Sequence, residues 1–255
     1  MLRSKWLRGL WRLGQPVFYT PGREKIKLPG LYLQFLKERR KFIELNGQAP
    51  FEELNPHLFD KSPGTQSGWG HYFYQDIWAL RHLAEFKPAL HHDVGSRYDG
   101  FVGQATALCP VVSYDIRPPS FRLPRFEFRY GNILDLPLAD ESVRSLSCLH
   151  VAEHIGLGRF GDELEPEGTA RALKELSRVL ESGGQLLFSM PIGRERVCFN
   201  AQRIWHPEKP IELLKNLKLA EFKAVDDAGE FREEATPSEF ASADFSCGLY
   251  RFLKP

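Results

Sequence analysis

The sequence predicts an α/β protein with a doubly wound parallel sheet, and three features of the chain lead to this prediction. From residue 89 onward, short apolar runs alternate with a stretch of helical periodicity. The first run ends in a glycine turn at Gly95, and the second ends in an acid, Asp115, 20 residues later. Glycine lets a ligand approach the backbone closely, and a carboxylate at that place accepts hydrogen bonds from ribose hydroxyls. The first βαβ unit is therefore predicted to hold a nucleoside.

The composition fits a globular protein of a reducing compartment. The chain has 255 residues, of which 42% are hydrophobic, enough for a packed core. No run of about 18 apolar residues is present, so no membrane-spanning helix is predicted. The basic start of the chain lacks the apolar core and cleavage site of a secretory signal. The four cysteines are far apart and show no metal-ligand spacing, which predicts reduced thiols, a cytoplasmic protein and no metal ion.

The net charge of +1 is unevenly distributed along the chain. Residues 1–49 carry eleven Lys or Arg and three Asp or Glu, a balance of +8, so the rest of the chain carries −7. Such a basic segment suits contact with an anionic lipid surface or a phosphorylated substrate, or else it packs on the acidic body of the protein. No nucleic-acid partner is expected, because no base-reading motif accompanies the charge.

Residues 1–70 are predicted to form a basic, helical accessory segment. Residues 1–14 place leucines and tryptophans among basic side chains at helical spacing, which is typical of helices that lie on a membrane surface. A second helix is expected over 29–46, with Pro29 in its first turn. Prolines and glycines make 47–70 an irregular connection to the core.

The core domain is predicted to span residues 71–255. It opens with a helix over 71–86, and a later helix over 166–181 has leucines at helical spacing. Two late apolar runs without a long helix between them predict an antiparallel hairpin at one edge of the sheet. The expected strands are, in chain order, 89–94, 110–115, 126–130, 143–149 and 184–190, followed by the late pair 219–226 and 245–253.

Several motifs in the core resemble those of the class I S-adenosylmethionine-dependent methyltransferases, and they occur in the order found in that superfamily. These motifs are Gly131-Asn132, Leu136-Pro137-Leu138, Asp140-Glu141-Ser142, Glu153-His154 and Gly183-Gly184. A wider set of segments resembles the family known as domain of unknown function 268, whose members often belong to surface-glycan systems. That set comprises residues 72–78, 93–101 and 147–162. The resemblance implies a Rossmann-like class I methyltransferase sheet with a late antiparallel hairpin, preceded by the helical N-terminal segment.

The resemblance also implies S-adenosylmethionine as the cofactor. Asn132 stands where the superfamily has an acid that meets the adenine amino group, and its amide oxygen still accepts a hydrogen bond but brings no charge. Ile133 is expected to contact the adenine face. The residues predicted to bind the cofactor are Asp93, Gly95, Ser96, Gly100, Asp115, Ile116, Asn132, Ile133 and His150.

The substrate is expected at the carboxyl ends of the central strands, where open α/β sheets bind their ligands. Methyl transfer to a sugar hydroxyl needs in-line alignment and a base, because the pKa of the hydroxyl is high. His150, Glu153 and His154 are the predicted catalytic residues, with one of the two histidines as the base. Alternatively, each histidine is a hydrogen-bonded residue at a helix start. Arg159 and Asp162 are predicted to bind the substrate, Arg159 through an anionic group such as a sugar phosphate.

The predicted function is methyl transfer to a small-molecule or saccharide acceptor in surface-glycan biosynthesis. The expected location is the cytoplasm, with peripheral contact to the inner membrane surface through residues 1–14. An NAD-dependent sugar oxidoreductase or epimerase is one alternative, but Gly95-x4-Gly100 lacks the GxGxxG spacing of dinucleotide-binding turns. A non-catalytic binding module of the same fold is another, although such a module has no need to keep Asp115.

Overall fold

The structure is a computed structural model, which describes residues 13, 14, 16–18, 22, 25–45, 56, 58 and 70–255. The chain divides into two compact units, Met1–Ser67 and Gly68–Pro255. In the N-terminal unit, a 3₁₀ turn (Lys25–Lys27) leads into helix α2 (Leu28–Glu44).

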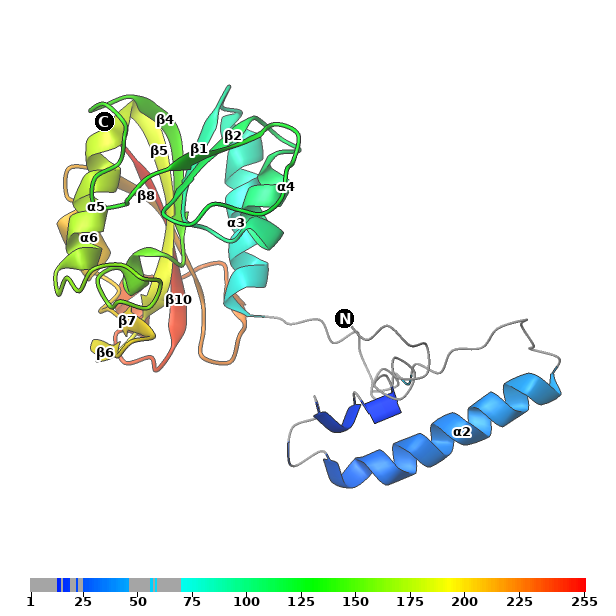
Figure 1. Ribbon diagram of the computed structural model, residues 1–255. Helices are drawn as coiled ribbons and strands as arrows, with labels where there is room; N and C mark the ends of the chain where they lie inside the picture. The colour runs from blue at the N-terminus through cyan, green and yellow to red at the C-terminus, as the bar shows by residue number, and fades with distance from the viewer. Residues whose placement is uncertain are drawn as a thin grey trace. The chain divides into compact units, whose positions relative to one another are not determined.

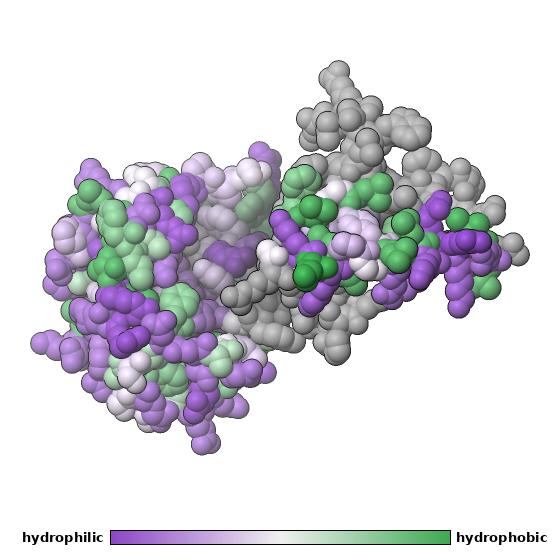
Figure 2. All heavy atoms as spheres, turned by 90° about the horizontal axis from the view of Figure 1, so that it is seen from below, coloured by the Kyte–Doolittle hydropathy of each residue, from purple (hydrophilic) through white to green (hydrophobic). Residues whose placement is uncertain are grey.

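Helix α2 confirms the helix predicted over 29–46, with Pro29 in its first turn. It exposes both charged and apolar side chains, and Figure 2 shows both kinds on the surface. Its most exposed apolar side chains are Leu33, Leu36 and Phe42. The helix predicted over 1–14 lies outside the described residues except for positions 13 and 14.

The second unit contains an eight-stranded sheet in the order β3-β2-β1-β4-β5-β10-β8-β9, and Figure 1 shows helices on both of its faces. All pairings from β3 to β5 are parallel, which confirms the predicted doubly wound parallel sheet. The strands are β1 (His91–Val94), β2 (Val111–Asp115), β3 (Phe126–Tyr130), β4 (Val143–Leu149), β5 (Leu180–Ile192), β8 (Lys218–Val225), β9 (Phe231–Arg232) and β10 (Ser246–Leu253). A separate two-stranded ribbon pairs β6 (Arg196–Cys198) with β7 (Gln202–Ile204).

The late strands β8 and β10 pair antiparallel at one end of the sheet, which confirms the predicted antiparallel pair. The last strand, β10, lies between β5 and β8 and runs antiparallel to both. The two-residue strand β9 occupies the edge beside β8. Burial explains why β10 and not β8 lies next to β5: β10 is buried along most of its length, whereas the first half of β8 is partly exposed. A strand buried in this way needs hydrogen-bond partners on both sides for its backbone groups.

Helices cover both faces of the sheet and make a three-layered unit (Figure 1). One face carries α3 (His71–Phe86) and α4 (Gly103–Ala105), the other α5 (Gly168–Val179) and α6 (Lys209–Leu213). Three shorter helical turns complete the set: Tyr98–Val102, Ala152–His154 and Pro237–Phe240.

The predicted helices 71–86 and 166–181 are thus confirmed as α3 and α5. Helix α5 buries one apolar side against the sheet because its small and apolar residues recur at helical spacing. In the part of the chain that the structure describes, no helix has the length and hydrophobicity needed to cross a bilayer.

Candidate functional site

A cavity of about 1,140 Å³ lies at the carboxyl ends of β1, β2 and β4. It is larger than the roughly 300–1,000 Å³ that pockets for one drug-sized ligand occupy, so it has room for two ligands side by side. Of the residues predicted for the site, those that line it are Gly95, Ser96, Asp115, Ile116, Asn132, Ile133, His150, Glu153, His154, Arg159 and Asp162.

The turn after β1 requires a glycine at position 95. Its φ of +70° lies in the left-handed region, and a Cβ there would come within 2.8 Å of Cγ1 of Val151. The Gly95 amide donates to the Tyr114 carbonyl at 2.9 Å, and the buried Ser96 hydroxyl accepts the Leu149 amide at 3.1 Å. These bonds tie the turn to both neighbouring strands, so the floor of the cavity is rigidly held.

Asp93 and Gly100 support this turn and do not line the cavity, so their predicted contact with the cofactor stays a prediction. The Asp93 carboxylate is fully buried and accepts hydrogen bonds from the Ser96 amide at 3.1 Å and the Ser147 hydroxyl at 2.5 Å. Burial raises its pKa to about 6. Gly100 lies against the Asp76 carboxylate of α3, which leaves no space for a Cβ.

Asp115 closes β2 at the cavity wall and already has a partner. Its carboxylate accepts three hydrogen bonds from Arg117, from the backbone amide at 2.8 Å and from two guanidinium nitrogens at 3.1 Å. The Asp115 side chain is 9% exposed, whereas the Arg117 side chain is 52% exposed. The arginine can therefore swing into solvent and free the carboxylate for a ribose diol.

Asn132 and Ile133 follow β3 and form the opposite wall. The Asn132 amide oxygen accepts the Leu134 amide at 2.9 Å, which fixes the side chain and leaves its NH₂ group as a donor. Ile133 is 5% exposed and presents an apolar face to the cavity. An amide donor beside an apolar surface suits the edge and face of a purine.

His150 follows β4 with a φ of +54°, and its side chain is buried. Its Nδ1 lies 2.7 Å from Oε1 of Glu153, while its Nε2 is buried without a hydrogen-bond partner. Burial alone lowers the pKa of His150, but the neighbouring Cys247 and Glu153 outweigh burial and raise the pKa well above its usual value. A histidine that keeps its proton at neutral pH is a poor general base, and Glu153 acts on it as a positioning residue.

His154 meets the requirements of a base better. Its Nδ1 lies 2.6 Å from the Ala201 carbonyl, so Nδ1 carries the proton and Nε2 keeps a free lone pair. Burial lowers the pKa of His154, so the ring is neutral at pH 7. The side chain is 12% exposed and lines the cavity.

Arg159 and Asp162 lie on the glycine-rich loop after this turn but have different surroundings. The Arg159 guanidinium lies 5.0 Å from the centre of the Phe160 ring and donates to the Ala201 carbonyl at 3.0 Å. Among the described residues, no carboxylate lies within ion-pair distance of Arg159. Both oxygens of Asp162 accept loop amides, those of Gly156 at 2.6 Å and Phe160 at 3.2 Å. Asp162 thus holds the loop in shape and also lines the cavity, and its predicted contact with the substrate stays a prediction.

The sequence prediction missed His71, Tyr72 and Cys247. The His71 ring is stacked on His150 at 5.3 Å, and the Tyr72 ring lies 5.0 Å from His150. Cys247 approaches the same imidazole from β10. For Tyr72 the only sequence signal was the resemblance of 72–78 to the uncharacterised family, which assigns it no role. His71 and Cys247 lie outside the segments that carry the resemblance.

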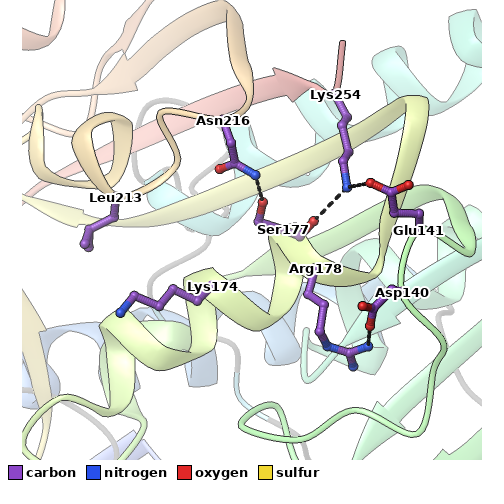
Figure 3. A pocket seen from close by; sticks show the side chains of 8 residues that line it. All are labelled: Asp140, Glu141, Lys174, Ser177, Arg178, Leu213, Asn216 and Lys254. Atoms are coloured by element: carbon purple, nitrogen blue, oxygen red, sulfur yellow. Dashed lines mark hydrogen bonds and ion pairs between the residues drawn. The ribbon is translucent and has the colours of Figure 1, made fainter.

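A second hollow, of about 480 Å³, lies near the amino end of β4 (Figure 3). Four of its five charged side chains already pair with one another: Lys254 with Glu141 at 2.9 Å, and Arg178 with Asp140 at 2.5 Å. It is far along β4 from the glycine turn, so the larger cavity is the candidate site.

Comparison with known proteins finds relatives in both sequence and fold. The family model described as "Caenorhabditis protein of unknown function, DUF268" matches residues 140–227. A Mycolicibacterium smegmatis protein named as a probable S-adenosylmethionine-dependent methyltransferase is 32% identical over 118 residues, or 43% of this chain. The match spans 40% of that relative's length.

Solved structures show the same fold at low sequence identity. The N-methyltransferase NodS from Bradyrhizobium japonicum, in complex with S-adenosyl-L-homocysteine, has a TM-score of 0.53 and 16% identity, covering 79% of this chain and 93% of its own. The [4+2]-cyclase SpnF has a TM-score of 0.51 and 16% identity, covering 71% and 81%. The chain thus has the fold of the class I S-adenosylmethionine-dependent methyltransferases, and over part of its length it is similar in sequence to a probable enzyme of that kind.

Proposed function

We propose that the protein transfers a methyl group from S-adenosylmethionine to a hydroxyl of a small-molecule or saccharide acceptor that carries an anionic group. One observation carries this proposal: a single cavity contains both the predicted nucleoside contacts, Asp115 and Asn132, and the polar groups His154 and Arg159. The sulfonium supplies an electrophilic methyl group, so the protein needs only to align the acceptor, accept its proton and exclude water.

His154 is proposed as the general base that accepts the proton of the acceptor hydroxyl. Its free Nε2 is 3.7 Å from Oε1 of Glu153, outside hydrogen-bond range, so the lone pair is available to a substrate. The proton that Nε2 receives is stabilised by the nearby Glu153 carboxylate. The bond between Nδ1 and the Ala201 carbonyl keeps the ring oriented throughout.

Arg159 is proposed to bind the anionic group of the acceptor. It lies five residues after His154 on the same wall, and it lacks an acidic partner among the described residues. Arg97 and Arg117 also line the cavity, but each forms an ion pair, with Asp99 and Asp115 respectively. A phosphate or carboxylate on the acceptor would form an ion pair with Arg159 without breaking an existing ion pair.

The setting in surface-glycan biosynthesis at the inner face of a membrane is part of the proposal. It is supported by the resemblance to the domain of unknown function 268 and by the excess of basic residues in 1–49. The oxidoreductase alternative has little support from the site. Many short-chain oxidoreductases use a tyrosine and a lysine four residues apart, and Tyr250 and Lys254 have this spacing. The Tyr250 ring, however, is fully buried in β10, and its hydroxyl donates to the Pro207 carbonyl at 2.8 Å.

A binding experiment and a turnover experiment test the proposal together. Because a ligand that binds only the folded state stabilises it, S-adenosyl-L-homocysteine should raise the melting temperature and NAD should not. Labelled S-adenosylmethionine should then methylate members of a panel of nucleotide-sugars and lipid-linked glycans. Stabilisation without turnover on any anionic acceptor would favour another activity, since the same fold also serves the cyclase SpnF. Stabilisation by NAD alone would refute the proposal.

A further inference from the structure

We propose that His71, His150 and Cys247 bind a single zinc ion at one end of the cavity. The three residues come from the first position of α3, the end of β4 and strand β10. One ligand atom from each side chain lies within 4.8 Å of the other two. They are 79 and 97 residues apart in the chain, so only the fold brings them together.

The donor set matches zinc. Two imidazole nitrogens and one thiolate are ligands that zinc prefers, whereas magnesium and calcium prefer oxygen. Cys247 is fully buried and His150 is 9% exposed. A divalent cation would balance the charges of the Cys247 thiolate and the adjacent Glu153 carboxylate in this water-poor environment.

The hydrogen bonds around His150 are those of a metal site. A metal-bound histidine usually donates its second ring N–H to a carboxylate or a backbone carbonyl. Nδ1 of His150 meets the Glu153 carboxylate at 2.7 Å, and its Nε2 is buried with no hydrogen-bond partner. The His71 ring is stacked on both His150 and Phe245. The unpartnered Nε2 of His150 thus has the burial of a ligand, and zinc would displace the proton that it carries in the metal-free protein.

Metal binding requires a small closure of the three side chains. Tetrahedral zinc bonds of about 2.0–2.3 Å place ligand atoms roughly 3.3–3.8 Å apart. The rings of His71 and His150 are stacked with an interplanar angle of 4°, so one ring must tilt before both lone pairs point at one ion. His71 can do this, because it is only partly buried and follows Gly70 at the start of α3.

Three protein ligands leave a fourth position for water, as in catalytic zinc sites. His71 and His150 both line the cavity, so this position faces the ligand-binding space. That the acceptor oxygen takes this position rests on the proposed function, whereas zinc binding itself does not.

Cobalt substitution tests the site on the full-length protein. After treatment with a chelator, the protein should bind one equivalent of Co²⁺ and show the visible absorption of tetrahedral cobalt together with a thiolate-to-cobalt charge-transfer band. One equivalent of Zn²⁺ should abolish both. Cys247→Ser should remove the charge-transfer band, and Glu153→Gln should weaken zinc binding about 10- to 100-fold.

His71→Ala is the second variant, because His71 is only partly buried and its loss is less disruptive than a change at Cys247. It should also weaken zinc binding, whereas the controls Cys198→Ser and His206→Ala, which change residues outside the cluster, should bind as the unaltered protein does. Binding of less than one equivalent, or an unchanged cobalt spectrum in Cys247→Ser, would overturn the inference. All these measurements omit S-adenosylmethionine, so failure of the zinc site and failure of methyl transfer are separate results.

Discussion

The carboxylate of Asp115 is predicted to hold the ribose of the cofactor, and its removal has a calculable cost. Two hydrogen bonds from ribose hydroxyls to a carboxylate contribute about 1.5–3 kcal/mol each. The ligand must first displace the half-exposed Arg117, and an exposed ion pair is worth about 0–1 kcal/mol. The net loss in Asp115→Ala is then about 2–6 kcal/mol, which corresponds to about 30-fold to about 20,000-fold weaker binding.

Isothermal titration with S-adenosyl-L-homocysteine measures this effect. Arg117→Gln should not weaken binding: it should bind the ligand equally or up to about fivefold more tightly, because about 1 kcal/mol of competition from the Arg117–Asp115 ion pair is removed. Glu127→Ala is the matched control, since Glu127 also pairs with an arginine two residues later but lies outside the cavity. Affinity within twofold of the unaltered protein in Asp115→Ala would show that the ribose binds elsewhere.

Three further predictions concern the turn and the base. Gly95→Ala should lower the free energy of unfolding by about 2–5 kcal/mol, because alanine is strained in the left-handed region and its Cβ is too close to Val151. When Val151→Ala is also present, the cost of Gly95→Ala measured by denaturant unfolding should fall to about 1–2 kcal/mol. His154→Gln should reduce kcat about 100-fold or more and leave the affinity for the cofactor unchanged. In the unaltered protein the rate should rise with pH at a midpoint below pH 6.5, because burial lowers the pKa of His154, and this rise should be absent from the variant. Burial raises the pKa of Asp93 from 3.8 to about 6. The contribution of its protonated carboxyl to stability is therefore full below pH 3.8 and is lost as the pH rises through about 6. In Asp93→Asn, the free energy of unfolding measured with urea should change less between these pH values.

Local patterns were enough to predict most elements of the core. The strands at 126–130 and 143–149 and helix α3 have the predicted bounds, because each combines its own periodicity with a nearby turn or proline. The place of β10 was not predictable in this way. Its sequence shows that it is apolar, but its insertion between β5 and β8 depends on which strands leave an unpaired edge.

The residues of the candidate site likewise include some that the sequence could predict and some that it could not. Asp115 and Asn132 were found because strand ends of a parallel sheet meet at one edge, whatever the side chains of the core. The sequence did not reveal that Asp93 is buried or that Gly100 packs against Asp76, since both depend on the packing of α3 and β4 around them. It also did not distinguish His150 from His154 as the base.

Sequence alone therefore determined the type of fold, the candidate nucleoside-binding edge and the set of polar residues near it, because these depend on short-range periodicity and on strand direction. Tertiary structure decided the state of each group: which histidine is neutral, which acid is already paired, and that His71 and Cys247 meet His150. Those properties arise from burial and from contacts between residues about 80 to 100 positions apart, and no local pattern encodes them.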